Sequence, residues 1–422
     1  MSSEGVGAMG EENDEKSALM PRLRFPEFRE AQEWEEKTLS AVCDMQAGKF
    51  VAASEISEEN AGGRYPCFGG NGLRGYTKTY NQSGRYSLIG RQGALCGNVN
   101  LVDGDFYATE HAVVTTPKAG NSTDWLFYNL CLLNLNRFAT GQAQPGLSVE
   151  VLEKVACLVP GDRDEQQKIA DCLSSLDELI TTETQKLDAL KTHKKGLMQQ
   201  LFPREGETAP RLRFPEFQEA GEWEEKLIEN FFDVGSSKRV LQEDWTTQGV
   251  PFYRTRELVS LSKKEPFRSE IFISEALFRD ISEKYGLPVE GDFLVSGVGT
   301  LGVSYQVQAQ DRFYFKDGNV LWFNLRGGII STFFKYCFEA DEIQNQILAQ
   351  ASISTVGTYT IQNAKVTKFS CPADIEEQQE IADCLSSLDN LITTQSQKIA
   401  TLQTHKKGLM QQLFPVLDKV PA

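Results

Sequence analysis

The stretch QQKIADCLSSLDELITTETQKLDALKTHKKGLMQQLFP, residues Gln166–Pro203, recurs as QQEIADCLSSLDNLITTQSQKIATLQTHKKGLMQQLFP at Gln378–Pro415. Thirty of the 38 positions are identical, and the last twelve residues, THKKGLMQQLFP, match without a substitution. Apolar residues recur at gaps of four and three in both copies, which is the spacing of a seam that packs against another helix. A proline ends each copy, as expected where a helix stops. Each copy is therefore predicted to form one long helix.

A second repeat precedes each of these helices. PRLRFPEFREAQEWEEK at Pro21–Lys37 recurs as PRLRFPEFQEAGEWEEK at Pro210–Lys226. Between each leader and its helix lies an insert, and the two inserts, Cys43–Gly161 and Phe231–Asp374, do not resemble each other in sequence. A nearly identical frame around divergent inserts indicates that the frame does one job twice, and that the inserts do two different jobs of the same kind.

The two helices are predicted to pair with each other, because no other segment offers a partner of equal length. A compact insert has its termini close together, so the end of the first helix lies near the start of the second, and the pair is antiparallel. The predicted fold class is α+β: two globular domains separated by two long helices that form an intramolecular antiparallel coiled coil with pseudo-twofold symmetry. The alternative is that each helix lies along a domain core.

The repeats also set the predicted domain boundaries. We expect a disordered acidic leader, two globular domains, two coiled-coil helices and a short tail. In chain order these segments are residues 1–20 (leader), 21–163 (first domain), 164–203 (first helix), 204–375 (linker and second domain), 376–415 (second helix) and 416–422 (tail).

Composition limits the class of protein. No apolar run approaches the ~18–20 residues of a membrane span, and the N-terminus has no secretory signal pattern. The nine cysteines are scattered without a CxxC pair, which favours reduced thiols and a cytoplasmic location. The net charge of −16, taken alone, argues against nucleic-acid binding. Much of the acid lies in the leader and in the repeated segments before each insert, so net charge is a weak guide to the inserts.

The sequence contains no familiar catalytic motif. Only three histidines occur, and His193 and His405 lie in the predicted helices, where they are expected to face solvent or a subunit contact. His111, beside Glu110 in ATEHAVV, has the chemistry of a general base, although a structural or contact role is favoured for such a pair. The glycine-rich stretch Val295–Gln308 lacks the spacing of a phosphate-binding loop and is expected to mark strand turns. No catalytic site and no metal site is predicted.

The first insert is typical of strands and turns, because Gly and Asn punctuate it every few residues. Arginines and lysines alternate there with tyrosines, and Asn and Gln lie beside them. Arg and Lys bind guanine edges and phosphates, whereas Asn and Gln bind adenine, so the insert is a candidate nucleic-acid face. Composition alone favours the plainer interpretation, a solvated β-surface with half-buried tyrosines.

Four stretches carry a resemblance to a known family: LRFPEF…EWEEK before each insert, YPCFGGNGLRGY…GRQGALCGNV…ATEHAVV in the first insert, GDFLVSGVGTLG in the second, and EQQKIADCLSSLDELI at the start of the helix. In the order and spacing of these stretches the chain resembles the specificity subunit of type I restriction–modification systems, a bacterial defence. The resemblance implies that each insert is a target recognition domain that reads one half of an asymmetric bipartite site on double-stranded DNA. It also implies that the helices set the half-site spacing and dock two methyltransferase subunits.

The resemblance implies further partners and cofactors. Restriction/translocase subunits would join the larger complex, and S-adenosylmethionine, ATP and Mg would be bound by partner subunits, with no cofactor in this chain. The chain itself would be a non-catalytic recognition subunit. The alternative function is a coiled-coil scaffold with two binding modules for non-nucleic-acid ligands, and an enzyme that uses His111 and Glu110 is a third hypothesis.

Candidate DNA-binding residues come from the predicted loops. In the first domain they are Arg64, Asn71, Arg74, Lys78, Arg91, Gln92, His111, Gln142 and Gln144. In the second domain they are Arg254, Arg256, Lys263, Thr300, Tyr305, Lys316 and Thr358. The helix ends supply candidate partner contacts, which are Lys194, Lys195, Met198, Lys406, Lys407 and Met410. Arg85 and Tyr253 are expected to be structural.

Overall fold

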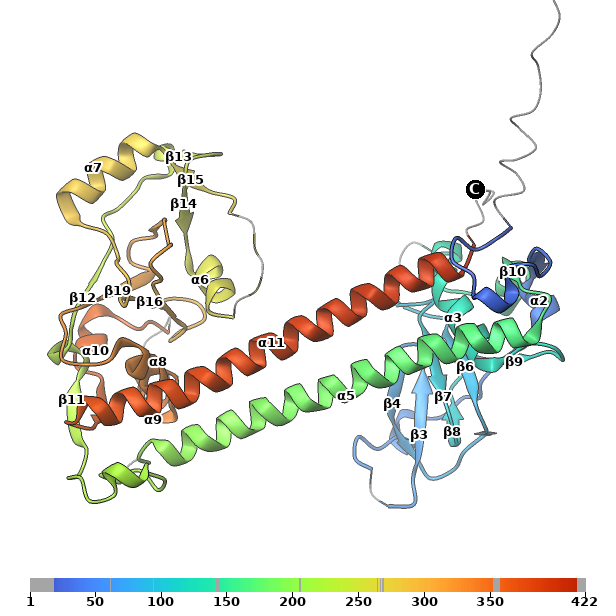
Figure 1. The fold of residues 1–422 in the computed structure, drawn as a ribbon, viewed down its shortest axis with the longest axis horizontal. Coiled ribbons are helices and arrows are strands. Elements are labelled where there is room, and N and C mark those ends of the chain that lie inside the picture. Colours follow the sequence, from blue (N-terminus) through green and yellow to red (C-terminus); the bar gives the residue numbers. More distant parts are fainter. Residues whose placement is uncertain are drawn as a thin grey trace, which may run out of the picture. The chain divides into compact units, whose positions relative to one another are not determined.

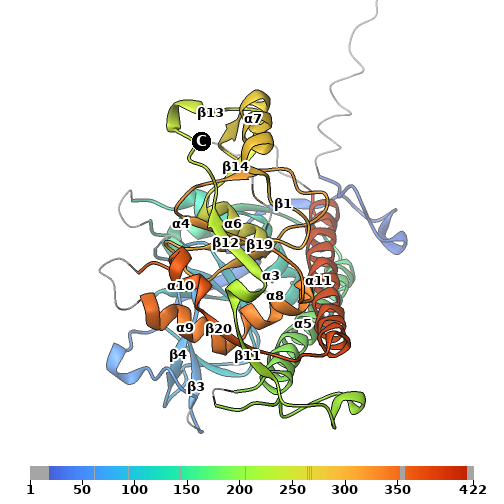
Figure 2. The ribbon, with the colours of Figure 1, turned by 90° about the vertical axis from the view of Figure 1, so that its left-hand side faces the viewer.

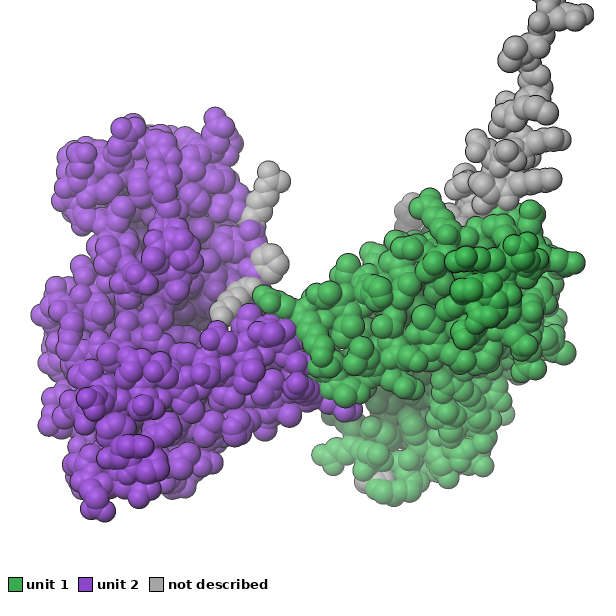
Figure 3. Space-filling view, viewed as in Figure 1, with its two compact units in different colours: residues 1–184, 397–422 green, residues 185–396 purple. Residues whose placement is uncertain are grey.

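The chain divides into two compact units (Figure 3). The computed structural model describes residues 19–60, 62–93, 95–141, 145–204, 206–263, 265, 267, 269–351 and 357–415. Unit 1 comprises residues 1–184 and 397–422, and unit 2 comprises residues 185–396. Two 39-residue helices, α5 (Arg163–Leu201) and α11 (Ile375–Leu413), contribute a segment to each unit. Each unit therefore contains one insert and parts of both long helices.

Unit 1 holds two four-stranded sheets and one strand pair in its described part. The strand order is β2-β9-β6-β7 in the first sheet and β4-β3-β8-β5 in the second, and β1 pairs with β10. The strands are β1 (Glu35–Thr38), β2 (Cys43–Ala47), β3 (Tyr65–Gly69), β4 (Gly72–Thr77), β5 (Gln82–Ser83), β6 (Tyr86–Gly90), β7 (Val99–Val102), β8 (Asp105–Ala108), β9 (Ala112–Pro117) and β10 (Ala156–Val159). The shorter helices are α2 (Leu39–Val42), α3 (Thr123–Leu132) and α4 (Val149–Glu153).

Unit 2 likewise holds two four-stranded sheets and one strand pair in its described part. The order is β12-β19-β16-β17 in the first sheet and β13-β15-β14-β18 in the second, and β11 pairs with β20. The strands are β11 (Glu224–Leu227), β12 (Phe232–Ser236), β13 (Trp245–Thr246), β14 (Val250–Tyr253), β15 (Phe272–Ile273), β16 (Phe293–Ser296), β17 (Ser304–Gln306), β18 (Tyr314–Phe315), β19 (Val320–Leu325) and β20 (Lys368–Cys371). The helices are α6 (Thr255–Ser262), α7 (Glu275–Tyr285), α8 (Ser331–Glu339), α9 (Asp341–Ala351) and α10 (Ile361–Lys365).

The two inserts share one framework although their sequences do not resemble each other. The order β2-β9-β6-β7 in unit 1 repeats as β12-β19-β16-β17 in unit 2. Cross-strand partners also correspond, because Gly90 faces Ala112 in the first sheet where Ser296 faces Val320 in the second. The helix before the last strand is capped in the same way in both units, by a hydroxyl that accepts from the backbone N–H three residues on. Equivalent positions can therefore be assigned across the units. The glycine-rich stretch after β16 is the turn into β17, as expected.

A buried cluster explains why the leader repeats together with the start of each helix. In unit 1 the Arg24 guanidinium donates from two nitrogens to the two carboxylate oxygens of Glu165, at 2.7 Å each, and Trp34 Nε1 donates to the same carboxylate at 3.3 Å. We call these three residues the leader triad. Its members in unit 2, with distances of 2.7, 2.7 and 3.2 Å, are Arg213, Trp223 and Glu377. The bidentate geometry is the strongest form of this ion pair.

The long helices run antiparallel within unit 1. Asp177 of α5 accepts from Lys406 of α11, and one to two turns farther along α5 Glu183 accepts from Lys398, which lies earlier in α11. Tyr128 of α3 donates to the same Asp177 carboxylate at 2.8 Å, which ties the first insert to both helices. Tyr128, Asp177 and Lys406 form what we call the helix triad of unit 1.

Unit 2 repeats the helix triad with one addition. Lys194 of α5 lies 2.7 Å from Asp389 of α11, and Tyr336 of α8 donates to Asp389 at 2.9 Å. Lys335 adds a second ammonium group 2.8 Å from the same carboxylate. The segments of α5 and α11 lie side by side in this unit, with α8 against them (Figures 1 and 2).

The identity of the twelve residues THKKGLMQQLFP has a cause inside the chain. The copy at Thr404–Pro415 belongs to unit 1, where the Gln412 carbonyl accepts from the Leu23 N–H at 2.9 Å and Phe414 packs on Trp34. The other copy belongs to unit 2 and makes the same contacts there. The Gln200 carbonyl accepts from the Leu212 N–H, and Phe202 packs on Trp223. Both copies thus meet the same leader sequence, so the same residues suit both places. None of the described helices is apolar over a length that would cross a membrane.

Candidate nucleic-acid interface

In unit 1 three turns converge on one small surface. They are the β3–β4 turn at Gly70, the segment that follows β6 at Gly90, and the β8–β9 turn that ends at His111. A Cβ at Gly90 would lie 1.8 Å from the Gly70 carbonyl oxygen, so only glycine permits this approach. The Arg91 N–H donates to the His111 carbonyl at 3.0 Å. The predicted residues Asn71, Arg91, Gln92 and His111 therefore come from turns that are in contact.

The converging turns leave polar atoms without partners. His111 Nε2 lies 3.2 Å from Glu110 Oε1, with both side chains about one-third exposed. Arg91 Nε, Glu110 Oε2 and His111 Nδ1 are buried and have no hydrogen-bond partner among the described residues. Each such atom costs about 1–3 kcal/mol when it stays unpaired. Three of them at one surface mark a polar cluster that water or a polar ligand can satisfy.

The cationic candidates Arg64, Arg74 and Lys78 of unit 1 lie on or beside the β3–β4 hairpin. Arg74 crosses near Gly69, where a Cβ would lie 3.7 Å from Arg74 Cδ and 3.6 Å from Thr109 Oγ1, so Arg74 belongs with the converging turns. Arg64 and Lys78 flank the Tyr65–Thr77 pair at the opposite end of the hairpin. Among the described residues these cations form no ion pair.

Arg85 differs from these cations, because it pairs with Asp103 and Asp124 at 3.3 and 2.7 Å, which fits the structural role expected of it. Gln142 and Gln144 lie outside the described residues. The backbone on either side of them is held, since Gly146 pairs with both Thr140 and Gln92. The prediction for the two glutamines stays open.

In unit 2 three of the seven candidates lie at a pocket of about 500 Å³. Thr300 and Arg256 line it together with Asn319 and Thr255, and the backbone of Thr358 pairs with Val298 at its edge. The Thr255 hydroxyl is buried and has no hydrogen-bond partner among the described residues. The pocket thus brings together three of the predicted residues, and adds Asn319, which the sequence alone did not single out.

Asn319 occupies in unit 2 the position of His111 in unit 1. The Gly297 N–H donates to the Asn319 carbonyl at 2.9 Å, and the Arg91 N–H donates to the His111 carbonyl at 3.0 Å. A second backbone hydrogen bond also matches. The Tyr359 N–H donates to the Gly297 carbonyl in unit 2 and the Leu147 N–H donates to the Arg91 carbonyl in unit 1, at 2.9 Å in both. The sequence does contain a signal for Asn319, because His111 and Asn319 each directly precede a buried strand. This signal becomes visible only when β9 is aligned with β19.

The two candidate arginines of unit 2, Arg254 and Arg256, are held by carboxylates, whereas the candidate arginines of unit 1 form no ion pair among the described residues. Arg254 and Arg256 both pair with Glu257, at 2.7 and 3.0 Å, and Arg256 also pairs with Glu270 at 2.7 Å. Burial by itself raises the pKa of Glu257, but hydrogen bonds from Arg254 and Arg256 outweigh it, and the pKa is lowered. Glu257 therefore stays charged and fixes the direction of both guanidinium groups, of which that of Arg256 is 62 % exposed.

The other three candidates of unit 2 lie away from the pocket or are engaged within the domain. Lys263 is exposed at the end of α6. Lys316 pairs with Asp317 at 3.0 Å. The Tyr305 hydroxyl donates to Asp311 at 2.8 Å, and burial raises the pKa of Tyr305, so this hydroxyl is occupied inside the domain.

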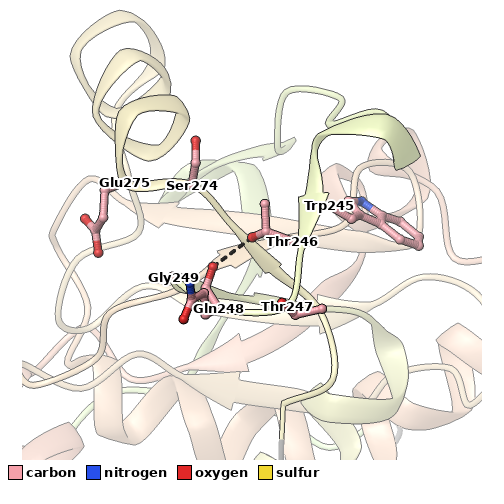
Figure 4. A pocket seen from close by; sticks show the side chains of 7 residues that line it. All are labelled: Trp245, Thr246, Thr247, Gln248, Gly249, Ser274 and Glu275. Carbon is pink, nitrogen blue, oxygen red and sulfur yellow. Dashed lines mark hydrogen bonds between the residues drawn. The ribbon is translucent and has the colours of Figure 1, made fainter.

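A larger pocket of unit 2, about 780 Å³, lies in the second sheet and holds none of the predicted residues (Figure 4). It is lined by Trp245, Thr246, Thr247, Gln248, Gly249, Ser274 and Glu275. The Thr246 hydroxyl donates to the Gln248 carbonyl at 2.8 Å, which closes the β13–β14 turn. The two pockets share no lining residue. We place the candidate interface at the smaller pocket, because the segments that line it match the converging turns of unit 1.

The candidate partner contacts divide into engaged and free side chains. Lys194 and Lys406 belong to the helix triads and are 16 % and 20 % exposed. Lys195 and Lys407 are exposed, and Met198 and Met410 are half-buried against the cores of units 2 and 1. In unit 2, Lys195 and Met198 also line a pocket of about 1070 Å³. The two histidines of the long helices, His193 and His405, are exposed. Partner contact by these residues stays a prediction.

Comparison with known proteins gives consistent matches. The family of type I restriction modification DNA specificity domains matches residues 31–192 and 220–404. The type I restriction enzyme EcoprrI specificity subunit of Escherichia coli is 46 % identical over 154 residues, which span 36 % of this chain and 38 % of that protein. A Haemophilus influenzae protein named as a type I restriction enzyme specificity subunit is 26 % identical over 354 residues, 82 % of this chain and 86 % of that protein.

A solved structure extends the match to the fold. The type I restriction–modification system S subunit from M. genitalium superposes with a TM-score of 0.66, covering 94 % of this chain and all of that chain at 16 % identity. That identity is low enough that the likeness shows the fold alone. The fold class predicted from the repeats agrees with it. With two copies of the family domain across most of its length, the chain belongs to the family of type I restriction–modification specificity subunits and carries two recognition domains.

Proposed function

We propose that each recognition domain reads one half of an asymmetric bipartite site on double-stranded DNA. The observation that carries this proposal is the matched pair of turns. His111 in unit 1 and Asn319 in unit 2 are held by the same backbone hydrogen bonds, yet present different side chains. A common framework with exchanged side chains is what two readers of different base sequences require.

The surrounding residues suit DNA in complementary ways. Asn binds the N6 and N7 edge of adenine, and a histidine ring donates to or accepts from base edges in the major groove. Arg74 forms no ion pair among the described residues, and Arg91 acts on the Glu150 carboxylate only through its charge. Both can contact phosphate, which positions the protein without selecting sequence. The net charge of −16 argues that part of the phosphate contact comes from partner subunits.

The long helices suit the spacing role that the family resemblance implies. Each has 39 residues, which at ~1.5 Å per residue gives about 58 Å, compared with roughly 34–36 Å for one turn of DNA. Two methyltransferase subunits would dock on the repeated helix surfaces, and restriction/translocase subunits would join them. S-adenosylmethionine, ATP and Mg would belong to those partners, which leaves this chain a non-catalytic role. The family match does not favour the alternative of a scaffold for other ligands.

The proposed function is tested by sequencing methylated adenine. The chain is co-expressed with its methyltransferase subunit in a host that lacks other adenine methylation, and genomic DNA is read by single-molecule sequencing. We expect one motif made of two different half-sites separated by a fixed unread gap. Omitting the chain should abolish the motif. Methylation without a motif, or a motif that does not depend on the chain, would refute the proposal.

Replacing His111 or Asn319 with alanine is expected to relax one half of the motif and leave the other half intact. The loss of a base-edge contact costs about 1–3 kcal/mol of discrimination, or roughly 5- to 150-fold at one base pair. The measurement is the methylation motif of each variant. Asn60→Ala in unit 1 and Asn324→Ala in unit 2 serve as matched controls, because both residues are exposed and lie outside the long helices, the converging turns and the smaller pocket. If His111→Ala and Asn319→Ala relaxed the same half-site, the assignment of one half to each unit would be wrong.

A further inference from the structure

Phe50 is a large apolar side chain that unit 1 holds out in solvent. Its exposed fraction is 74 %, the highest of the large apolar residues described. The backbone around it is nevertheless fixed. The Lys49 N–H donates to the Ala108 carbonyl at 2.9 Å, the Tyr107 hydroxyl donates to the Phe50 carbonyl at 3.0 Å, and the next side chain, Val51, is buried. The exposure of Phe50 is therefore built into the fold.

The anchor of Phe50 is the turn that carries His111. Lys49 forms a parallel bridge with Thr109, the first residue of the β8–β9 turn. A Cβ at Gly48 would lie 2.3 Å from the Ala108 carbonyl oxygen, so the two backbones approach as closely as glycine allows. Phe50 thus stands beside the candidate interface, on a segment that the predictions from sequence did not include.

Charge and apolar surface meet at this place. Lys49 is exposed and, like Arg74, has no ion pair among the described residues. Two further exposed leucines, each 54 % exposed, lie on the other converging segments: Leu73 on β4 and Leu95 after β6. Apolar side chains flanked by cations are typical of proteins that insert a wedge between bases while contacting phosphates.

Unit 2 offers a different residue at the equivalent place. Ala47 faces Val113 at the end of β2, and Ser236 faces Leu321 at the end of β12, so Lys49-Phe50-Val51 corresponds to Lys238-Arg239-Val240. The valine is buried in both units, at 6 % and 3 % exposure. Arg239 is exposed, as Phe50 is. The same loop therefore presents an aromatic ring in one domain and a guanidinium group in the other.

We propose that Phe50 inserts at a base step of the half-site read by unit 1 and unstacks it, whereas Arg239 contacts a phosphate in the other half-site. The inference rests on the proposed DNA-recognition function and deepens it, because it predicts that only one of the two half-sites is deformed on binding. Unstacking costs a few kcal/mol and is offset where an apolar side chain packs against the exposed base face.

The test uses the full-length chain with its methyltransferase subunits and a library of random duplex DNA. Selection with the wild-type complex gives the bound motif, and duplexes carrying that motif are then made with 2-aminopurine at successive positions of each half-site. Phe50→Ala is expected to weaken binding by about 5- to 150-fold, the range for one base–aromatic contact. The 2-aminopurine fluorescence should rise on binding in the half read by unit 1 only, and Phe50→Ala should abolish that rise. Phe50→Trp should retain both.

Salt dependence separates the two residues. Because Phe50 contacts no phosphate, Phe50→Ala should leave the slope of log K against log[salt] unchanged. Arg239→Ala should reduce the magnitude of that slope by about 0.9, with no change in 2-aminopurine fluorescence. A wild-type complex that selects no motif would refute the proposed function and this inference together. If the motif is found, equal binding and equal fluorescence of wild type and Phe50→Ala would overturn the inference alone. Loss of methyltransferase binding by Phe50→Ala would also overturn it, by assigning Phe50 to a protein contact.

Discussion

Replacing Glu165 with alanine is expected to destabilise unit 1 by about 3–5 kcal/mol, the range for removing one partner of a buried ion pair. Glu165 is 1 % exposed and Arg24 is 6 % exposed, so the guanidinium group would stay buried without its counter-charge. Trp34 Nε1 would lose its acceptor at the same time. A loss of this size is a large fraction of the stability of a domain.

The repeat supplies a matched experiment in the same chain. Glu377→Ala removes the corresponding carboxylate, which is fully buried, and should affect unit 2 by a similar amount. Hydrogen exchange followed by mass spectrometry assigns the loss of protection to residues of one unit or the other. Glu178→Ala, at an exposed position on α5, is the control and should change stability by less than about 0.5 kcal/mol. Losses under about 1 kcal/mol in both triad variants would contradict the claim that each leader triad stabilises its own unit.

Replacing Asp389 with asparagine is expected to lower the stability of unit 2 at pH 7. It should also remove the part of that stability that the wild type loses in acid. Burial alone raises the pKa of Asp389, but the charges and hydrogen bonds of Lys335 and Lys194 outweigh it, and the pKa is lowered from 3.8 to about 2. A shift of this size corresponds to about 2 kcal/mol. Since the folded-state pKa is the lower one, the contribution is fully present above about pH 4 and is lost as the pH falls towards 2.

The measurement is urea unfolding of unit 2 between pH 7 and pH 2.5, in the wild type and in Asp389→Asn. The wild type should lose its advantage over the variant as the pH falls below 4. Asp177→Asn is the matched comparison in unit 1, where the carboxylate is 39 % exposed and meets one lysine instead of two, so its effect should be smaller. A constant difference between wild type and Asp389→Asn across this pH range would contradict the assignment of the low pKa to Asp389.

The frame of the molecule was predictable because its signals are local. A 3–4 apolar spacing over 38 residues predicts a helix from sequence alone, and the observed bounds of α5, Arg163–Leu201, differ from the expected 164–203 by two residues at most. The antiparallel direction followed from chain connectivity and is seen within unit 1 in the order of its lysine–carboxylate pairs. These features need no knowledge of side-chain packing.

The inserts were less predictable because their similarity is tertiary. Sheet order is set by contacts between strands that are far apart in the chain. The sequences of β6 and β16 give no sign that the two strands hold equivalent positions in their sheets. His111 is one of only three histidines and follows a glutamate, which makes it a candidate from sequence alone. Its counterpart Asn319 has no comparable distinguishing feature in the sequence. The repetition of Lys194 and Lys406 predicts partner contacts, but both lysines are engaged within the chain, in the helix triads.

The most direct test of the central claim, that each recognition domain reads its own half-site, is the methylation motif of a chain with two identical domains. Residues 35–159 are replaced by residues 224–371, with both junctions at equivalent ends of the paired strands β1–β10 and β11–β20. Genomic methylated adenine is then sequenced after co-expression with the methyltransferase subunit. The predicted result is a motif in which the half-site read by unit 2 occurs on both sides of the gap. Retention of the original asymmetric motif would contradict the claim.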